Sequence, residues 1–334
     1  MNSKFTKLIG AVGILLCAGH AGASAIITDG NISLGVDDFG QLNIGGGVAD
    51  VAGETFVGMR YIDTATGSQY ESTSHGCYCE GWGVGIVETS ESGFINNSAG
   101  GGGLVLDSFV STATTATSVV SSASLQVTHA FELATETDNL YRVTVSIENT
   151  TATDIDNLRY RRTFDWDTSP TPFNEFVTIG GTAAATSVIG ATDDGFCSSD
   201  PFSFCGTIEA GASGDFDASG PNDHGANFDF DFGALAAGDT FEFEIFYGGA
   251  IGEAAALTSL GLVGAEAYSF GWSGDDTNQD GFIDETTDLA PTFIFGFAGV
   301  GGVSLPPHSD VDEPAVFAMF GLAAFVLMRL RRKA

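Results

Sequence analysis

Apolar and polar residues alternate in several segments of this chain, and long runs with helical spacing are rare. In YRVTVSIEN (141–149), the residues that would share the buried side of a strand are Tyr141, Val143, Val145 and Ile147. In LRYRRTFDWD (158–167), the expected inward residues are Leu158, Tyr160, Phe164 and Trp166, and the expected outward residues are Arg159, Arg161, Asp165 and Asp167. The turn-rich NTTATD separates the two segments, so the pattern predicts a β-hairpin.

A second pair of alternating segments lies in FDFDFGALAAGDTFEFEIFYGG (228–249). The apolar positions are Phe228, Phe230 and Phe232 before a loop at Gly238 and Asp239, and Phe241, Phe243, Ile245 and Tyr247 after it. The intervening positions are largely carboxylates, which predicts a second hairpin with an aromatic inner face and an acidic outer face.

Three further elements complete the expected fold. Residues 252–262 have the helical spacing of a short helix, TFIFGFAGVGG (292–302) is typical of a central strand, and residues 108–124 favour a strand, a turn and a strand. Antiparallel sheets with one dry face and one wet face predict a mainly β fold. We therefore expect an antiparallel β-sandwich with one short helix, built as a single unit over residues 26–303.

The charge distribution excludes one class of partner. All 43 acidic residues lie between residues 29 and 313, together with only five of the 11 basic residues. Such a body repels nucleic acid, whose binding requires Lys and Arg to neutralise phosphate, so no nucleic-acid partner is expected. An acidic surface of this kind is typical of solubility in a salty, screened medium.

The N-terminus has the features of a signal peptide over residues 1–25. Lys4 and Lys7 precede an apolar stretch at 8–18, and AGASA offers the small residues Ala23 and Ala25 for cleavage. The mature chain would then begin at Ile26.

Four cysteines remain after removal of the signal: Cys77, Cys79, Cys197 and Cys205. An even number in an exported chain favours disulfides over zinc, which more typically uses C-x-x-C spacing or nearby histidines. All three pairings stay open, because a C-x-C pair is strained and links between the two regions are equally compatible with the sequence.

The C-terminal segment contains a short apolar run. After a polar, proline-bearing linker at 304–312, residues 315–328 carry no charge and would form about 21 Å of helix, against about 30 Å of bilayer hydrocarbon. The run is too short for a comfortable permanent anchor. We expect a short transmembrane helix that spans only transiently, with its terminal cations in the cytoplasm.

The order of parts in residues 313–334 resembles the PEP-CTERM sorting signal of Gram-negative bacteria. The matching residues are Glu313 and Pro314, followed by the apolar helix and the basic cluster Arg331, Arg332 and Lys333; Asp312 replaces the first proline of the family motif. The resemblance implies export through the inner membrane, processing by an exosortase partner, and a cell-surface or extracellular location associated with exopolysaccharide.

The segment DDTNQDGFIDE (275–285) resembles the calcium loops of EF-hands, dockerins and thrombospondin type 3 repeats. Oxygen ligands alternate around Gly281, and the candidate Ca²⁺ ligands are Asp276, Asn278, Asp280, the Phe282 carbonyl and Asp284. The expected carboxylate at the last position is replaced by Thr287. The loop predicts a weak structural calcium site, and the alternative is an acidic surface turn.

No catalytic constellation is recognised in the sequence. Asp165 and Asp167 could form a glycoside-cleaving pair, but ion pairs with Arg159, Arg161 and Arg162 are favoured. His224 beside Asp223 could be a metal-binding or catalytic pair, and a surface turn is favoured for it. We therefore expect a non-enzymatic matrix protein with a structural or adhesive role; the alternatives are a carbohydrate-active enzyme and a Ca²⁺-dependent glycan-binding module.

Overall fold

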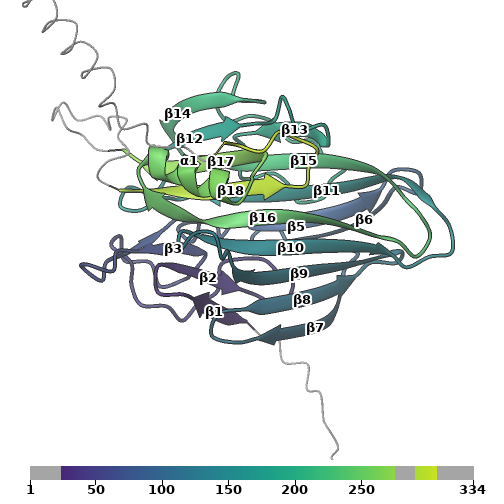
Figure 1. The fold of residues 1–334 in the computed structure, drawn as a ribbon, viewed down its shortest axis with the longest axis horizontal. Coiled ribbons are helices and arrows are strands. Elements are labelled where there is room, and N and C mark those ends of the chain that lie inside the picture. Colours follow the sequence, from purple (N-terminus) through teal and green to yellow (C-terminus); the bar gives the residue numbers. More distant parts are fainter. Residues whose placement is uncertain (1–23, 275–289, 307–334) are drawn as a thin grey trace, which may run out of the picture.

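The computed structural model describes residues 24–274 and 290–306. These residues form three antiparallel β-sheets and one short α-helix (Figure 1). The predicted mainly β fold with one helix is therefore confirmed. Ala25 lies at the start of the first strand, opposite Val36. Outside the described residues lie Ala23, the calcium-like loop with Asp276, Asn278, Asp280, Phe282 and Asp284, and the sorting signal with Glu313, Pro314, Arg331, Arg332 and Lys333.

The three sheets differ in size. The four-stranded sheet has the order β1 (Ala25–Thr28), β2 (Ile32–Val36), β3 (Met59–Ile62), β4 (Gln69–Glu71). The nine-stranded sheet has the order β14 (Phe216–Asn222), β12 (Glu175–Gly180), β17 (Ala267–Ser273), β18 (Pro291–Ala298), β16 (Thr240–Ile251), β10 (Leu140–Asn149), β9 (Leu125–Leu133), β8 (Ala116–Ser121), β7 (Val105–Ser111). The five-stranded sheet has the order β13 (Val188–Thr192), β15 (His224–Leu235), β11 (Ile155–Trp166), β5 (Glu80–Ile86), β6 (Glu91–Asn96).

Several predicted elements are present. β10 buries Tyr141, Val143, Val145 and Ile147. β18 lies between β17 and β16 and is buried along its whole length, as expected of a central strand. The helix α1 (Glu253–Leu262) packs against β16 and β18 (Figure 1), and β7 and β8 form the predicted pair.

Both predicted hairpins are wrong. β10 and β11 belong to different sheets, and so do β15 and β16. Each connecting loop crosses from one sheet to the other instead of turning back within a sheet. The predicted inner faces are nevertheless right, since the aromatic series on β15 and β16 meet across the interface: the Phe232 and Phe241 ring centroids lie 4.3 Å apart, and those of Phe230 and Phe243 lie 6.1 Å apart. The alternation had identified the buried faces but not the strand partners.

The main core lies between the nine-stranded and the five-stranded sheets. Phe228 and Phe230 of β15 contact Phe297 of β18, at centroid distances of 4.8 and 4.9 Å. All three rings are fully buried, and each contributes about 1.5–3 kcal/mol by leaving water. This aromatic layer holds the two larger sheets face to face.

An irregular segment covers the other face of the five-stranded sheet. Gly81, Gly83 and Gly85 alternate along β5, and a methyl group on any of them would collide with the segment containing Ser199, Pro201 and Phe202. The absence of side chains at these positions allows the covering segment to lie directly on the strand. Arg161, Asp165 and Asp167 share this face and are only 1–2% exposed. The expectation that they point outward into solvent is therefore wrong.

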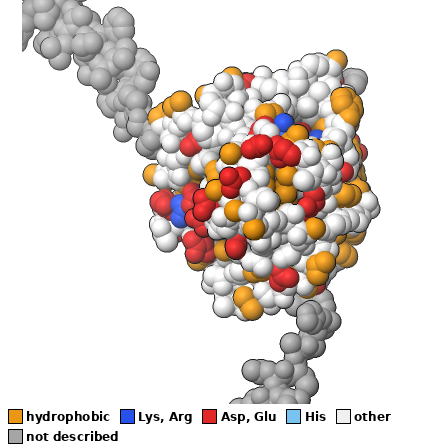
Figure 2. Space-filling view, turned by 90° about the vertical axis from the view of Figure 1, so that its right-hand side faces the viewer, with side chains coloured by type: hydrophobic (Ala, Val, Ile, Leu, Met, Phe, Trp, Pro, Cys, Tyr) orange, Lys and Arg blue, Asp and Glu red, His pale blue; other side chains and the backbone are white. Residues whose placement is uncertain are grey.

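The remaining surface is acidic, and Figure 2 shows carboxylates over one face of the molecule with few basic side chains among them. Within the described residues, no helix has the length and apolar character needed to cross a bilayer.

Candidate metal centre

Three carboxylates from distant parts of the chain converge where the two larger sheets meet. Asp167 follows β11, Glu175 is the first residue of β12, and Asp223 lies between β14 and β15. Glu175 pairs with Asn222, which places Asp223 next to it. One oxygen from each of Asp167, Glu175 and Asp223 lies within 4.8 Å of the others. We call these three residues the carboxylate cluster.

The carboxylate cluster is buried on one side and reaches the surface on the other. Asp167 is 1% exposed and Glu175 is completely buried, whereas Asp223 is partly exposed. The cluster is thus a polar site inside the protein with one member in contact with solvent.

Most oxygens of the cluster have no hydrogen-bond partner among the described residues. These are both carboxylate oxygens of Asp167, Oε2 of Glu175 and Oδ1 of Asp223. The exception in Glu175 is Oε1, which accepts a hydrogen bond from the His224 backbone N–H at 3.2 Å. Buried carboxylate oxygens without partners are rare in proteins, because their lost hydration is not replaced.

Burial and mutual repulsion shift the cluster toward its protonated form. Burial, followed by the negative charge of Asp223, raises the pKa of Asp167 to about 8. Burial, followed by the charge of Asp167, raises the pKa of Glu175 to about 10. Burial also raises the pKa of Asp223, although the neighbouring His224 opposes that rise. Other charged groups facing Asp167 are Glu54, Glu71 and His75.

Two His–Asp pairs flank the cluster and orient its backbone. His75 Nδ1 donates to the Asp167 carbonyl at 3.0 Å, and its Nε2 lies 3.6 Å from Asp50 Oδ2. His224 Nε2 donates to the Glu175 carbonyl at 3.1 Å, and its Nδ1 lies 3.2 Å from Asp193 Oδ2. Each imidazole therefore binds a main-chain carbonyl of the cluster, while its other nitrogen faces a carboxylate outside the cluster.

Several sequence predictions about these residues need correction. His224 is fully buried, so the favoured surface turn is wrong, although His224 and the Asp223 next to it do belong to one site. The ion pairs expected across the sheet are present for the arginines, since Arg159 pairs with Asp231, Arg161 with Asp229, and Arg162 with Glu80. Among the described residues, however, none of the three arginines pairs with Asp165 or Asp167, so that part of the expectation is wrong. Each arginine thus pairs with a carboxylate on a neighbouring strand. Asp165 and Asp167 lie on the covered face of the sheet without an arginine partner among the described residues.

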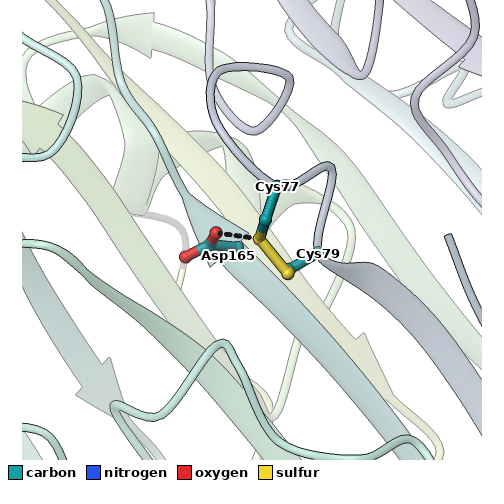
Figure 3. A group of neighbouring side chains, drawn as sticks. All are labelled: Cys77, Cys79 and Asp165. Carbon is teal, nitrogen blue, oxygen red and sulfur yellow. Dashed lines mark hydrogen bonds between the residues drawn. A yellow bond between two sulfur atoms is a disulfide. The ribbon is translucent and has the colours of Figure 1, made fainter. Parts of the chain in front are cut away.

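Asp165 connects the cluster to a disulfide. The structure pairs Cys77 with Cys79 and Cys197 with Cys205, which selects the two local links among the possible pairings. Asp165 Oδ2 lies 3.2 Å from Cys77 Sγ (Figure 3). A disulfide sulfur carries no proton, so only a protonated Asp165 can donate a hydrogen bond in this contact. This is consistent with the pKa of Asp165, which burial and then the charge of Asp167 raise well above its usual range.

The two disulfides are poor candidates for metal ligands. Sulfurs of Cys77 and Cys79 lie near Asp165, and those of Cys197 and Cys205 lie near Asp194. Metal ions bind the thiolate form of cysteine, which a disulfide does not provide. Oxygen chemistry therefore dominates the site, and the carboxylate cluster is the stronger candidate for a cation.

The sequence indicated only two of the three residues of this site. It drew attention to Asp167 and Asp223 separately and did not indicate Glu175. The three residues are brought together by the pairing of β12 with β14 and by the packing of the sheets, neither of which is visible in local spacing.

No known protein family matches this chain, and a search of the curated proteins also finds no match.

Proposed function

We propose that this chain is an exported protein with a β-sandwich body, which an exosortase processes at residues 313–334 and which is released to, or displayed in, the extracellular polysaccharide matrix. Its role there is structural or adhesive. One structural observation supports export most directly: all four cysteines of the body are paired in disulfides. Structural disulfides persist in oxidising compartments and are rare in the cytosol. The signal-peptide pattern and the PEP-CTERM-like tail agree with this location.

The surroundings of the acidic residues favour a non-enzymatic role over glycoside cleavage. A catalytic pair of carboxylates must flank a bound sugar, whereas Asp165 and Asp167 are each 1% exposed. Two open hollows in the described part of the chain lie elsewhere: one is next to Val188 and Ser213, and the other next to Glu242 and Ala298.

Intact-mass analysis of the secreted protein tests the proposal. The full chain is expressed in an exosortase-bearing host and in the same host without its exosortase gene. The expected product from the first host begins near Ile26, lacks residues 315–334 and shows the mass loss of two disulfides. In the second host the tail should remain attached and the protein should fractionate with the membrane.

Variants make this test specific to the sorting signal. Replacing Glu313 and Pro314 by alanine should reproduce the exosortase-deficient result, whereas Asp156→Asn, an exposed change on β11, should be processed normally. Secretion of a product that retains residues 315–334 from the exosortase-bearing host would rule out the proposed processing. A normal product from the host without exosortase would rule it out equally.

A further inference from the structure

We propose that Asp167, Glu175 and Asp223 bind a single Ca²⁺ ion inside the body of the protein, through ligands other than those predicted in the calcium-like segment at 276–284. The inference goes beyond the proposed export and matrix role and does not depend on it.

The first argument is the uncompensated charge. Asp167 is 1% exposed, and neither of its carboxylate oxygens has a hydrogen-bond partner among the described residues. Glu175 is fully buried and Asp223 partly so, and each also has an oxygen without a partner in the same part of the chain. No Lys or Arg forms an ion pair with any of these three residues within residues 24–274 and 290–306. A cation supplied from solution would provide the missing positive charge.

The second argument is the spacing of the oxygens. One oxygen from each residue lies within 4.8 Å of the others. Ca²⁺ binds oxygen at about 2.3–2.6 Å, so two ligands on opposite sides of one ion are about 4.6–5.2 Å apart and adjacent ligands are closer. A single Ca²⁺ ion can therefore contact all three carboxylates. Mg²⁺ is less suitable, because it demands regular octahedral geometry at about 2.0–2.1 Å and gives up its waters reluctantly.

The surroundings provide both orientation and access. His75 and His224 hold the backbone carbonyls of Asp167 and Glu175, which fixes the main chain from which two ligands extend. Asp223 is partly exposed, so an ion can reach the site from solvent. The ligands belong to segments that end or begin strands of both larger sheets. Bound Ca²⁺ would therefore tie the two sheets together at this end of the molecule.

Isothermal titration with CaCl₂ tests the proposal on the full-length protein after dialysis against a chelator. Asp280→Ala serves as the background, because it removes a central ligand of the 276–284 loop. We expect this variant to retain one Ca²⁺ per chain. Adding Asp167→Asn should weaken the remaining binding at least about tenfold, because calcium affinity depends on the number of charged ligands. Adding Asp156→Asn, on the same strand as Asp165 but exposed, should leave binding unchanged.

A second substitution distinguishes loss of a calcium ligand from misfolding of the variant. Asp223→Asn alters the partly exposed ligand and should also weaken binding at least about tenfold in the Asp280→Ala background. Circular dichroism and thermal denaturation in chelator establish that each variant is folded. The proposal is overturned if Asp280→Ala binds no Ca²⁺, or if folded Asp167→Asn and Asp223→Asn variants in that background bind it with unchanged affinity.

Discussion

Two buried acidic sites in this protein lie at similar depth but differ in how their charge is balanced. Glu71 is completely buried and accepts hydrogen bonds from Arg60 Nε at 2.9 Å and from the backbone N–H groups of Met59 and Ser72 at 3.1 and 3.0 Å. The Arg60 guanidinium also donates to the Val48 carbonyl at 2.6 Å. In the carboxylate cluster, by contrast, Asp167 has no partner on either oxygen among the described residues.

The difference shows where the chain provides its own counter-charge. Burial raises the pKa of Glu71, while Arg60 and the surrounding N–H groups oppose that rise. For Glu175, burial and three neighbouring aspartates all raise the pKa, and only the His224 N–H opposes them. At the first site, the chain itself supplies the counter-charge and the hydrogen-bond donors for the buried carboxylate. The second requires either protons or a cation from solution, which is the basis for assigning it to Ca²⁺.

Removing the Arg60 counter-charge from buried Glu71 should have the largest effect on the stability of the protein. Arg60→Gln leaves Glu71 buried without its cation and should lower the free energy of unfolding by about 3–5 kcal/mol. Urea denaturation in chelator measures this. An effect below about 1 kcal/mol would show that Arg60 and Glu71 are not coupled in the way their geometry indicates.

The pH dependence of the cluster should give the next largest effect. The folded-state pKa values of Asp167 (about 8) and Glu175 (about 10) lie above the ordinary values of 3.8 and 4.5. The folded protein therefore holds protons that the unfolded chain has released. The stability that these groups contribute is present at low pH and is lost as the pH rises through their folded-state pKa values.

A double variant isolates this pH effect from all other titrating groups. In chelator, the wild type should lose stability relative to Asp167→Asn/Glu175→Gln as the pH rises from about 5 to about 9. Urea unfolding at several pH values provides the measurement. Parallel pH profiles for the two proteins would show that the cluster has ordinary pKa values.

The single substitution Asp167→Asn should have a smaller effect of the opposite sign from Arg60→Gln. In chelator at about pH 8, replacing a buried unpaired carboxylate by an amide should raise the free energy of unfolding by about 1–2 kcal/mol, because a charge is costlier than a dipole to bury without partners. Addition of Ca²⁺ should reverse the order, because it stabilises the wild type more than the variant. Loss of stability in chelator would indicate an internal partner for Asp167.

The smallest effect is expected at a partly exposed ion pair. Arg159 and Asp231 lie 3.2 Å apart, with side chains 24% and 23% exposed. Arg159→Gln should cost less than about 1 kcal/mol in the same urea assay, because water already screens this pair. A cost equal to that of Arg60→Gln would mean that burial does not determine the difference between these ion pairs.

For the two predicted hairpins, the sequence identified the strand faces that lie in the core but not which strands pair. The alternation in β10 correctly placed Val143 and Val145 in the core, because one side of that strand is dry. It could not show that Phe232 and Phe241 belong to different sheets and meet across the core. Two strands that pair within one sheet and two strands that pack from opposite sheets both present apolar residues at alternate positions, so the pattern does not distinguish them.

The candidate metal centre was less accessible to sequence reasoning. Asp167 is buried because the segment containing Ser72 and His75 packs against it: the Asp167 backbone N–H donates to the Ser72 carbonyl at 2.7 Å, and His75 Nδ1 donates to the Asp167 carbonyl at 3.0 Å. Glu175 and Asp223 lie 48 positions apart in the chain and meet only because β12 pairs with β14. Local spacing carries no information about such a long-range contact.

Anomalous diffraction from crystals of the protein grown with Ca²⁺ tests the calcium assignment most directly. The account predicts an anomalous peak among Asp167, Glu175 and Asp223, with calcium–oxygen distances of about 2.3–2.6 Å. The peak should disappear in crystals of Asp167→Asn grown under the same conditions. A wild-type map in which this position holds only water, or in which the carboxylates are joined directly by hydrogen bonds, would contradict the assignment.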